Sequence, residues 1–313
     1  MSQECRPTIR TRVPLPVAQE AEVLRKAMKG MGTDEAAIIK VLTSCSNNQR
    51  QVLIQEYKRA FDRDLIKDLK KELAGNFEDV VLALMTPTSE FLATELKHAL
   101  NRKDGDSVVQ IIFASDPARV SSIKAAYDSA NDDKLEEDFD DEMKGVFEDV
   151  LIATVLSKRG EDCSEDVAVS VARAIYNDDH GVDKDEVVKA FSTLSFKQLR
   201  HVFLEYYKLA GRTLGEAFGL EFKGKEKANM QALFKCIENR SGYLAAALRD
   251  SMAGPGTNDR NLIRLVVSRS EVDLGSVKDE YFKMYNKTLE GDIQHDTSGD
   301  YKKVLLALTQ YNY

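Results

Sequence analysis

The chain contains no tryptophan, and its 313 residues include only six prolines and four cysteines. The cysteines, Cys5, Cys45, Cys163 and Cys236, lie too far apart in sequence for a metal knuckle or a redox pair, so we expect free thiols in a reducing compartment. No apolar run approaches the roughly 18 residues that a membrane span needs. The N-terminal stretch MSQECRPTIRTRVPLP also lacks the apolar core of a signal peptide. We therefore expect any contact with a membrane to be peripheral.

What remains is a charged, helix-favouring composition. Hydrophobic residues make up 43% of the chain and charged residues 31%, which is typical of a folded globular protein. Ala, Leu, Lys and Glu are abundant and favour helices. The net charge is −8, so the chain is not expected to seek nucleic acid or an acidic membrane by charge alone.

The sequence repeats itself four times. The segments DLIKDLKKELAGNFEDVVLALM (64–85) and KLEEDFDDEMKGVFEDVLIATV (134–155) share the pattern E-[LM]-x-G-x-F-E-D-V. Two weaker copies follow at 213–234 and 288–309. We therefore expect an N-terminal tail at 1–14 and repeats at 15–86, 87–160, 161–243 and 244–313, with a polar linker after the second repeat.

Each repeat has the apolar spacing of several short helices. In the first repeat, Asp34 and Asp64 are placed to cap the second and fourth helices, and residues 49–61 form the third. Gly75 is predicted to end the fourth helix as its C′ glycine, and residues 77–85 form the fifth. No segment shows the alternation of a strand. The sequence thus predicts an all-α fold with five helices in each repeat.

Two hexapeptides, MKGMGT (28–33) and MAGPGT (252–257), place two glycines one residue apart after a helix. Glycine allows a tight turn without a Cβ clash, so such a loop can aim several carbonyl oxygens at one point. Neutral oxygens at short range suit a hard cation, and Ca²⁺ tolerates their irregular geometry better than Mg²⁺ does. A carboxylate should join them. Glu72 lies 40 residues after Gly32, and Asp296 lies 40 residues after Gly256.

The third repeat keeps part of this pattern. Its loop reads NDDHGV (177–182), with Asp179 in place of the first glycine and Gly181 as the second. Glu221 again follows 40 residues after Gly181. These residues predict a third site, with a silent loop as the alternative.

The second repeat departs from the pattern. It keeps Glu142, but its loop LNRKDGD (100–106) is two residues shorter and carries Arg102 and Lys103. We expect no cation to bind there, so that cations occupy two or three of the repeats rather than all four.

The [ML]-x-G-x-G-T loop, the distant acidic residue and the fourfold repeat resemble the annexin family, over nearly the whole chain from about residue 15. The resemblance implies a slightly curved disc of four five-helix repeats. It also implies calcium-dependent, reversible binding to acidic phospholipids such as phosphatidylserine, with Ca²⁺ bridging between the protein and the lipid head groups. The implied ligands are the carbonyls of Met28, Gly30 and Gly32 with Glu72, those of Met252, Gly254 and Gly256 with Asp296, and a minor site at Thr33 and Glu35.

The charge of such a site agrees with this role. Three carbonyls and one bidentate carboxylate fill about five of the six to eight ligand positions of Ca²⁺ and leave the site positive and open. A lipid oxygen can complete it, which reconciles an acidic protein with an acidic surface. The resemblance implies a cytoplasmic protein that is peripheral at membranes when calcium rises. It is also compatible with self-association on membranes and with leaderless export.

The residues between the paired glycines carry two interpretations. Met31 and Pro255 either touch the interfacial region of the bilayer or are variable loop positions. His180 takes the same place in the third repeat. It either makes lipid binding pH-sensitive near its ordinary pKa of about 6.5 or is a solvated loop residue.

Three other classes of protein were weighed. For an enzyme, the histidines at 98, 180, 201 and 295 form no metal or triad signature, and the phosphate-loop-like GLEFKGK (219–225) lacks the following Ser or Thr. An EF-hand sensor would need another order of carboxylates than NDDHGVDKDE (177–186) offers. A purely helical scaffold would leave the repeated glycine loop unexplained. We therefore expect a binding protein and no enzymatic activity.

Overall fold

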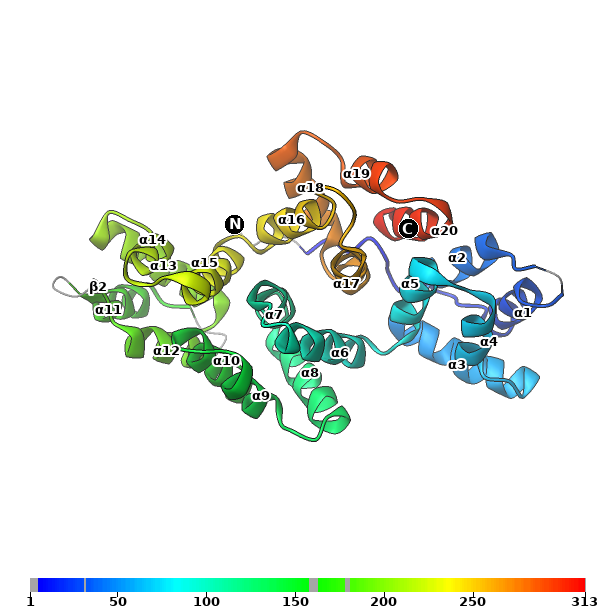
Figure 1. The fold of residues 1–313 in the computed structure, drawn as a ribbon, viewed down its shortest axis with the longest axis horizontal. Coiled ribbons are helices and arrows are strands. Elements are labelled where there is room, and N and C mark those ends of the chain that lie inside the picture. The colour runs from blue at the N-terminus through cyan, green and yellow to red at the C-terminus, as the bar shows by residue number, and fades with distance from the viewer. Residues whose placement is uncertain (1–4, 31, 158–162, 178–180, 313) are drawn as a thin grey trace. The chain divides into compact units, whose positions relative to one another are not determined.

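The computed structural model describes residues 5–30, 32–157, 163–177 and 181–312. Within these residues the chain forms twenty helices, five for each repeat, and one short hairpin (Figure 1). The first repeat comprises α1 (Val17–Ala27), α2 (Glu35–Thr43), α3 (Asn47–Phe61), α4 (Leu65–Glu72) and α5 (Gly75–Met85). The second comprises α6 (Thr88–Asn101), α7 (Gly105–Ile112), α8 (Pro117–Ala130), α9 (Leu135–Glu142) and α10 (Val146–Leu156).

The second half of the chain follows the same order. The third repeat comprises α11 (Glu165–Ile175), β1 (Tyr176–Asn177), β2 (Gly181–Val182), α12 (Lys184–Thr193), α13 (Phe196–Ala210), α14 (Leu214–Glu221) and α15 (Gly224–Glu238). The fourth comprises α16 (Arg240–Ser251), α17 (Asp259–Ser270), α18 (Leu274–Tyr285), α19 (Leu289–Asp296) and α20 (Gly299–Thr309). The expected all-α fold of four five-helix repeats is confirmed. In the described part of the chain, no helix is long and apolar enough to cross a membrane.

Local sequence signals explain most helix ends. The side chains of Asp34 and Asp64 accept hydrogen bonds from the backbone N–H groups of Ala37 and Lys67, as the capping pattern predicts. The prediction for Gly75 was wrong, because α4 ends at Glu72 and Gly75 begins α5 with φ +61°. A glycine in the left-handed region can mark the turn into a helix as well as the turn out of one.

The hairpin of the third repeat is a second departure from the expectation. Strands β1 and β2 are antiparallel, and Tyr176 pairs with Val182. Each strand has only two residues, too few to show the alternation by which a strand is recognised in sequence.

The helices assemble as two compact units, one of residues 1–91 with 244–313 and one of residues 92–243. Both units pair two repeats in the same way. In the first unit α2 and α5 pack against α20, and α5 also packs against α17. In the second unit α7 and α10 pack against α15, and α10 also packs against α12. The second and fifth helices of each repeat therefore provide the apolar faces that join repeat 1 to repeat 4 and repeat 2 to repeat 3.

The predicted boundary at 243/244 falls inside α16. This helix begins at Arg240, directly after Asn239, which separates it from α15. We propose that the fourth repeat begins at Arg240 and that the other boundaries stand as predicted.

The N-terminal tail lies as an extended strap across the first unit. The backbone N–H groups of Thr8 and Ile9 both donate to the Ser270 carbonyl, at 2.8 and 3.0 Å. The Thr8 hydroxyl is buried and donates to the Leu308 carbonyl at 2.6 Å. Further along, Arg12 exchanges two hydrogen bonds with the Gln49 side chain, of 3.0 and 2.7 Å. The strap thus connects the fourth repeat to the first.

A buried arginine joins the same two repeats. Arg50 of α3 is 1% exposed, and its guanidinium donates to the carbonyls of Leu42 and Cys45 at 2.7 and 2.6 Å. It also pairs with Glu271 at 3.1 Å. Burial lowers the pKa of Arg50, and the Glu271 carboxylate opposes that shift. This one side chain therefore satisfies two carbonyls at and just beyond the end of α2.

Three repeats anchor their short fourth helix with the same buried hydrogen bond. The Tyr57 hydroxyl of α3 donates to Asp68 of α4 at 2.9 Å, and Arg63 pairs with the same carboxylate at 2.6 Å. Equivalent tyrosine–aspartate bonds join Tyr127 to Asp138 and Tyr281 to Asp292, with a sequence separation of 11 in each case. The third repeat has Tyr206 but Ala217 at the partner position. Since the fourth helix carries the acidic residue at its end, this bond helps to place it.

We expect Asp68→Asn to lower the melting temperature by about 4 °C at pH 7. The Asp68 side chain is 7% exposed, and its charged hydrogen bonds contribute about 1.5 kcal/mol after allowance for the half-exposed Arg63. The Arg63 hydrogen bond lowers the pKa of Asp68 below that of an unfolded aspartate. The contribution is therefore complete above about pH 4 and disappears as the pH falls through the folded pKa.

Calorimetry at pH 7 and pH 3 checks this expectation. The difference between wild type and variant should shrink at pH 3. A constant difference at both pH values would contradict the assigned role of the carboxylate charge.

Candidate metal centre

The glycine loop of the first repeat closes between the end of α1 and the start of α2. Gly30 and Gly32 have φ of +121° and +89°, which L-residues rarely adopt, so the loop depends on glycine at both positions. The Asp34 N–H donates to the Ala27 carbonyl at 2.9 Å and closes the loop. The Thr33 hydroxyl donates to the Glu72 carboxylate at 3.0 Å. The predicted loop and its distant carboxylate therefore lie side by side.

The fourth repeat has the same arrangement. Gly254 and Gly256 have φ of +99° and +92°, and the Asn258 N–H donates to the Ser251 carbonyl at 2.7 Å. The Thr257 hydroxyl donates to the Asp296 carboxylate at 2.5 Å. Asp296 is the last residue of α19, as Glu72 is the last residue of α4. The shorter aspartate reaches the loop as glutamate does.

The first residue of each glycine loop is buried, whereas the glycines are exposed. The side chains of Met28 and Met252, which begin the loops, are 5% and 6% exposed and fix the backbone to the core. The glycines are exposed, and so is Pro255 at the tip of the fourth-repeat loop. Met31, Asp179 and His180 lie outside the described residues. The backbone oxygens and the carboxylate of each loop form an all-oxygen donor set, which fits a hard cation such as Ca²⁺.

The third repeat meets its carboxylate through the backbone. The Val182 N–H donates to Glu221 at 2.5 Å, and the Asp183 N–H closes the loop on the Ile175 carbonyl at 2.9 Å. Glu221 ends α14, so the position of the acidic residue is preserved. Gly181 lies in β2 rather than in a turn that directly follows a helix.

The second repeat replaces the loop hydroxyl with an ammonium group. The Asp104 N–H closes the loop on the Ala99 carbonyl at 2.9 Å, so the turn is two residues shorter than in the first repeat. The Lys103 Nζ lies 3.4 Å from Glu142 Oε2. A positive side chain therefore faces the carboxylate that ends α9.

A glycine with positive φ follows three residues after the acidic residue in every repeat. These glycines are Gly75, Gly145, Gly224 and Gly299, with φ between +61° and +74°. The turn sends the chain into the fifth helix and leaves the acidic residue at the exposed end of the fourth. The recurring glycine was visible in the repeat pattern, but its place at the start of the fifth helix was not.

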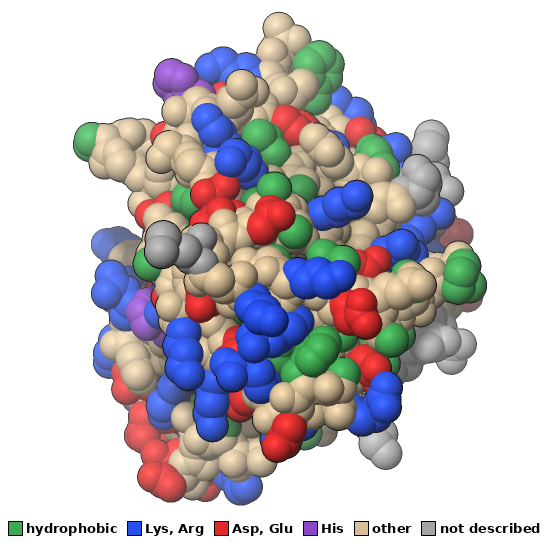
Figure 2. All heavy atoms as spheres, turned by 90° about the vertical axis from the view of Figure 1, so that its right-hand side faces the viewer, with side chains coloured by type: hydrophobic (Ala, Val, Ile, Leu, Met, Phe, Trp, Pro, Cys, Tyr) green, Lys and Arg blue, Asp and Glu red, His purple; other side chains and the backbone are tan. Residues whose placement is uncertain are grey.

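The charge around the two glycine loops differs. Lys70 and Lys71 are exposed and directly precede Glu72, whereas Gln294 and His295 precede Asp296. Lys29 is also exposed in the first loop. Figure 2 views the side on which the first repeat lies, and it shows Lys and Arg side chains gathered there. The first site therefore has a more basic rim than the fourth.

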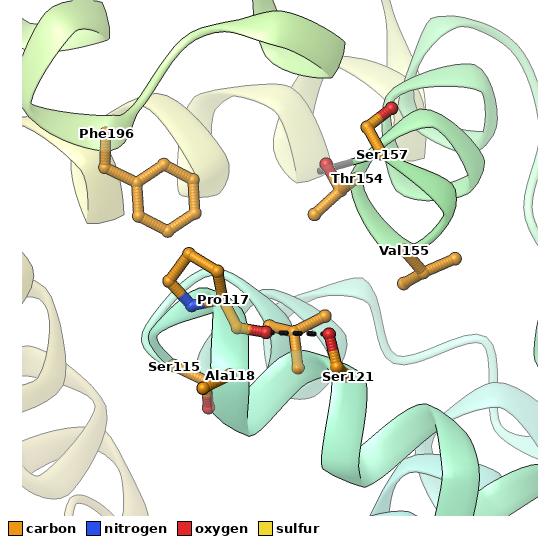
Figure 3. Close-up of a pocket in the computed structure, with 9 residues that line it drawn as sticks. Ser115, Pro117, Ala118, Ser121, Thr154, Val155, Ser157 and Phe196 are labelled. Carbon is orange, nitrogen blue, oxygen red and sulfur yellow. Dashed lines mark hydrogen bonds between the residues drawn. The ribbon is translucent and has the colours of Figure 1, made fainter. Parts of the chain in front are cut away.

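Another recess, in the second unit, has a different character (Figure 3). It measures about 240 Å³ and lies between α8, α10 and α13, where Pro117, Thr154 and Phe196 contribute to its walls. Its lining is apolar with hydroxyl groups. The described residues contain no group of three or more His, Cys, Asp or Glu side chains arranged to hold a metal. His98, His201 and His295 stand on three separate helices, α6, α13 and α19.

Comparisons with known proteins identify the family. The Annexin family model matches residues 19–84 and 243–308, the two repeats with complete glycine loops. Annexin A5 of Mus musculus is 40% identical over 92% of this chain and 93% of its own length. Annexin B10 of Drosophila melanogaster is 38% identical over 96% and 97%. The structure titled annexin III superposes with a TM-score of 0.90 at 31% identity and covers 97% of both chains.

A further structure, titled calcium-bound annexin (Sm)1, matches with a TM-score of 0.86 at 29% identity over 97% of this chain and 93% of that one. A repeated all-α fold with oxygen-lined loops and these similarities define one class, and the chain belongs to the annexin family. Annexins are in general calcium-dependent, phospholipid-binding proteins without enzymatic activity.

Proposed function

We propose that this annexin binds acidic phospholipid membranes reversibly in the presence of calcium, through the loops of its first and fourth repeats. One observation carries the proposal. In both repeats a threonine at the end of the glycine loop is hydrogen-bonded to the carboxylate that ends the fourth helix, at 3.0 Å for Glu72 and 2.5 Å for Asp296. Loop and carboxylate are thereby held together before any ion arrives.

The residues of each loop have separate tasks. We assign the carbonyls of Met28, Gly30 and Gly32 and the Glu72 carboxylate as ligands in the first repeat. The equivalent ligands of the fourth repeat are the carbonyls of Met252, Gly254 and Gly256 with the Asp296 carboxylate. Calcium supplies the positive charge that links these oxygens to the phosphate or carboxylate oxygens of a lipid. Thr33 and Glu35, at the start of α2, form the proposed minor site.

The surroundings of the loops favour an acidic lipid. Lys29, Lys70 and Lys71 around the first site attract a negatively charged head group such as phosphatidylserine. We propose that Pro255, and Met31 by its equivalent position in the sequence, touch the interfacial region of the bilayer. We propose that the protein acts at the cytoplasmic leaflet, where anionic lipids are concentrated. Self-association on the membrane and leaderless export are compatible with this function but not needed for it.

The third repeat offers a weaker site. Glu221 lies at the proper helix end and contacts the hairpin through Val182. We propose that Gly181 and Glu221, together with Asp179, bind calcium less tightly than the other two sites. Two features support the lower rank. Gly181 lies in a strand rather than in a turn that directly follows a helix, and α14 lacks the tyrosine–aspartate bond that anchors the other fourth helices.

We expect calcium affinity to rise at least tenfold when phosphatidylserine vesicles are present. Each proposed site leaves ligand positions at which a lipid oxygen can replace water, and linkage requires lipid and calcium to raise each other's affinity by the same factor. Calorimetric titration with and without vesicles measures this factor, and sedimentation with vesicles in calcium or in chelator measures the binding itself. Vesicles of phosphatidylcholine alone serve as the control. Equal calcium affinity in both titrations would contradict the proposed bridging.

A further inference from the structure

The second repeat retains the architecture of a calcium site but places a lysine in it. Asp104 caps α7 as Asp34 caps α2, so Lys103 occupies the position of Thr33. In every repeat the residue before the cap contacts the carboxylate at the end of the fourth helix. The contact is a hydroxyl in the first and fourth repeats, a backbone N–H in the third, and the Lys103 ammonium in the second.

The short loop directs this ammonium toward Glu142. Lys103 has φ +53°, a conformation that residues with a Cβ adopt infrequently. Its N–H donates to the Leu100 carbonyl at 2.8 Å, and the Arg102 N–H donates to Ala99 at 3.2 Å, so the turn is tightly hydrogen-bonded. The result is an ammonium 3.4 Å from the Glu142 carboxylate.

The Lys103 ammonium is exposed to solvent and keeps donors for a second partner. The Lys103 side chain is 53% exposed and Glu142 is 30% exposed. An ammonium group has three donors, and the contact with Glu142 uses one of them. Arg102, directly before it, is also exposed. Such an ammonium contacts a carboxylate on one side and can donate to an anion on the other, so it shares the positive sign, though not the double charge, of the calcium ion proposed for the first and fourth repeats.

The nearby acidic side chains are directed elsewhere. Asp104 accepts hydrogen bonds from the backbone N–H and the hydroxyl of Ser107, at 3.1 and 2.7 Å. Asp106 accepts from the Tyr243 hydroxyl at 3.0 Å. Asp140 of α9 shares a hydrogen bond with Glu148 of α10. Asp141 lies on a face of α9 that is rotated by about 100° from Glu142.

We propose that Lys103 takes the place of calcium in the second repeat: it neutralises Glu142 and donates its remaining N–H groups to the phosphate of an acidic phospholipid. This contact needs no calcium and is sensitive to salt, because a charged side chain alone makes it. The inference rests on the proposed membrane binding and extends it. The second repeat, in which the sequence predicts no calcium site, then contributes to membrane binding by a different chemistry.

The test compares Lys103→Gln with wild type on vesicles of phosphatidylserine and phosphatidylcholine at saturating calcium and low salt. We expect the variant to bind about fivefold more weakly, the effect of one basic residue at an anionic surface. The number of calcium ions bound per protein should stay the same, and the difference should fade as salt rises. Lys197→Gln removes the same charge from an exposed position on α13 and should change binding far less.

Two outcomes separate this inference from the proposed function. Wild-type protein that fails to sediment with the vesicles in calcium would overturn the proposed function. Normal wild-type binding with Lys103→Gln indistinguishable from Lys197→Gln would overturn only the role of Lys103.

A loop graft tests the position of Glu142 independently. Replacing Asn101-Arg102-Lys103 with Lys-Gly-Met-Gly-Thr gives the second repeat the loop of the first. We expect this variant to bind one additional calcium ion per molecule in the presence of vesicles. A graft of native helix content that binds no additional ion would show that Glu142 is not positioned as a calcium ligand and would refute the substitution by Lys103.

Discussion

The double variant Glu72→Gln/Asp296→Asn is expected to lose calcium-dependent sedimentation with phosphatidylserine vesicles. Each substitution keeps the size of the side chain and an oxygen that can accept from Thr33 or Thr257, but removes the one formal negative charge of its site. Three neutral carbonyls alone bind Ca²⁺ weakly in water. Each single variant should raise the calcium concentration for half-maximal binding by about tenfold. This corresponds to a loss of about 1.4 kcal/mol in the free energy of calcium binding. Sedimentation across a calcium series measures both effects.

Matched controls exist at the same position of the other repeats. Glu142→Gln removes a carboxylate from the end of α9, where we expect the short loop to bind no calcium, and should leave the number of bound calcium ions unchanged. Glu221→Gln decides the third repeat: a smaller loss of calcium affinity supports the weak site, and no change shows that the repeat is silent. If Glu72→Gln and Asp296→Asn left calcium binding unchanged, the ligand assignment would be wrong.

Arg50→Met is expected to produce the largest loss of stability, about 3–5 kcal/mol, and to lower the melting temperature of the protein by about 10 °C. The arginine is 1% exposed and satisfies the carbonyls of Leu42 and Cys45. Its removal takes the guanidinium donors from these two carbonyls and leaves the Glu271 carboxylate with the Asn47 N–H but without its positive partner. Lysine cannot replace it, since one ammonium cannot reproduce the planar fork of donors that reaches the carbonyls of Leu42, Cys45 and Leu84 and the Glu271 carboxylate. Differential scanning calorimetry measures the shift.

A second arginine on the same helix provides the control for this variant. Arg59 is 74% exposed and pairs with Glu56, one turn away. Arg59→Met should therefore change the free energy of unfolding by less than about 0.5 kcal/mol. Similar melting temperatures for the two variants would contradict the structural role of Arg50.

Local patterns in the sequence predicted the elements well. The caps at Asp34 and Asp64 and the five-helix repeat follow from short-range rules that tertiary packing did not override here. The pairing of Gly32 with Glu72 was predictable because a repeated spacing of 40 residues indicates a shared geometry. The structure shows the same pairing as a hydrogen bond from Thr33.

Features that depend on packing between distant segments were not predictable in this way. The hydrogen bond between Tyr57 and Asp68 recurs at a spacing of 11 residues in three repeats. An alignment of the repeats contains this spacing, but the pattern of apolar residues does not indicate it. The ion pair of Lys103 with Glu142 required the shortened loop to be seen in three dimensions. The pairing of the first repeat with the fourth could not be predicted from the order of the helices along the chain.

The pairing of the first repeat with the fourth has a consequence for folding during synthesis on the ribosome. The second unit is one uninterrupted stretch, residues 92–243, and can fold as soon as it has emerged. The first unit joins residues 1–91 to residues 244–313. The apolar faces of α2 and α5 therefore remain unburied until α17 and α20 have been synthesised. The segment around Thr8 can dock only afterwards, because its partners Ser270 and Leu308 follow it in the chain by 262 and 300 residues. This segment is thus translated long before it can become native.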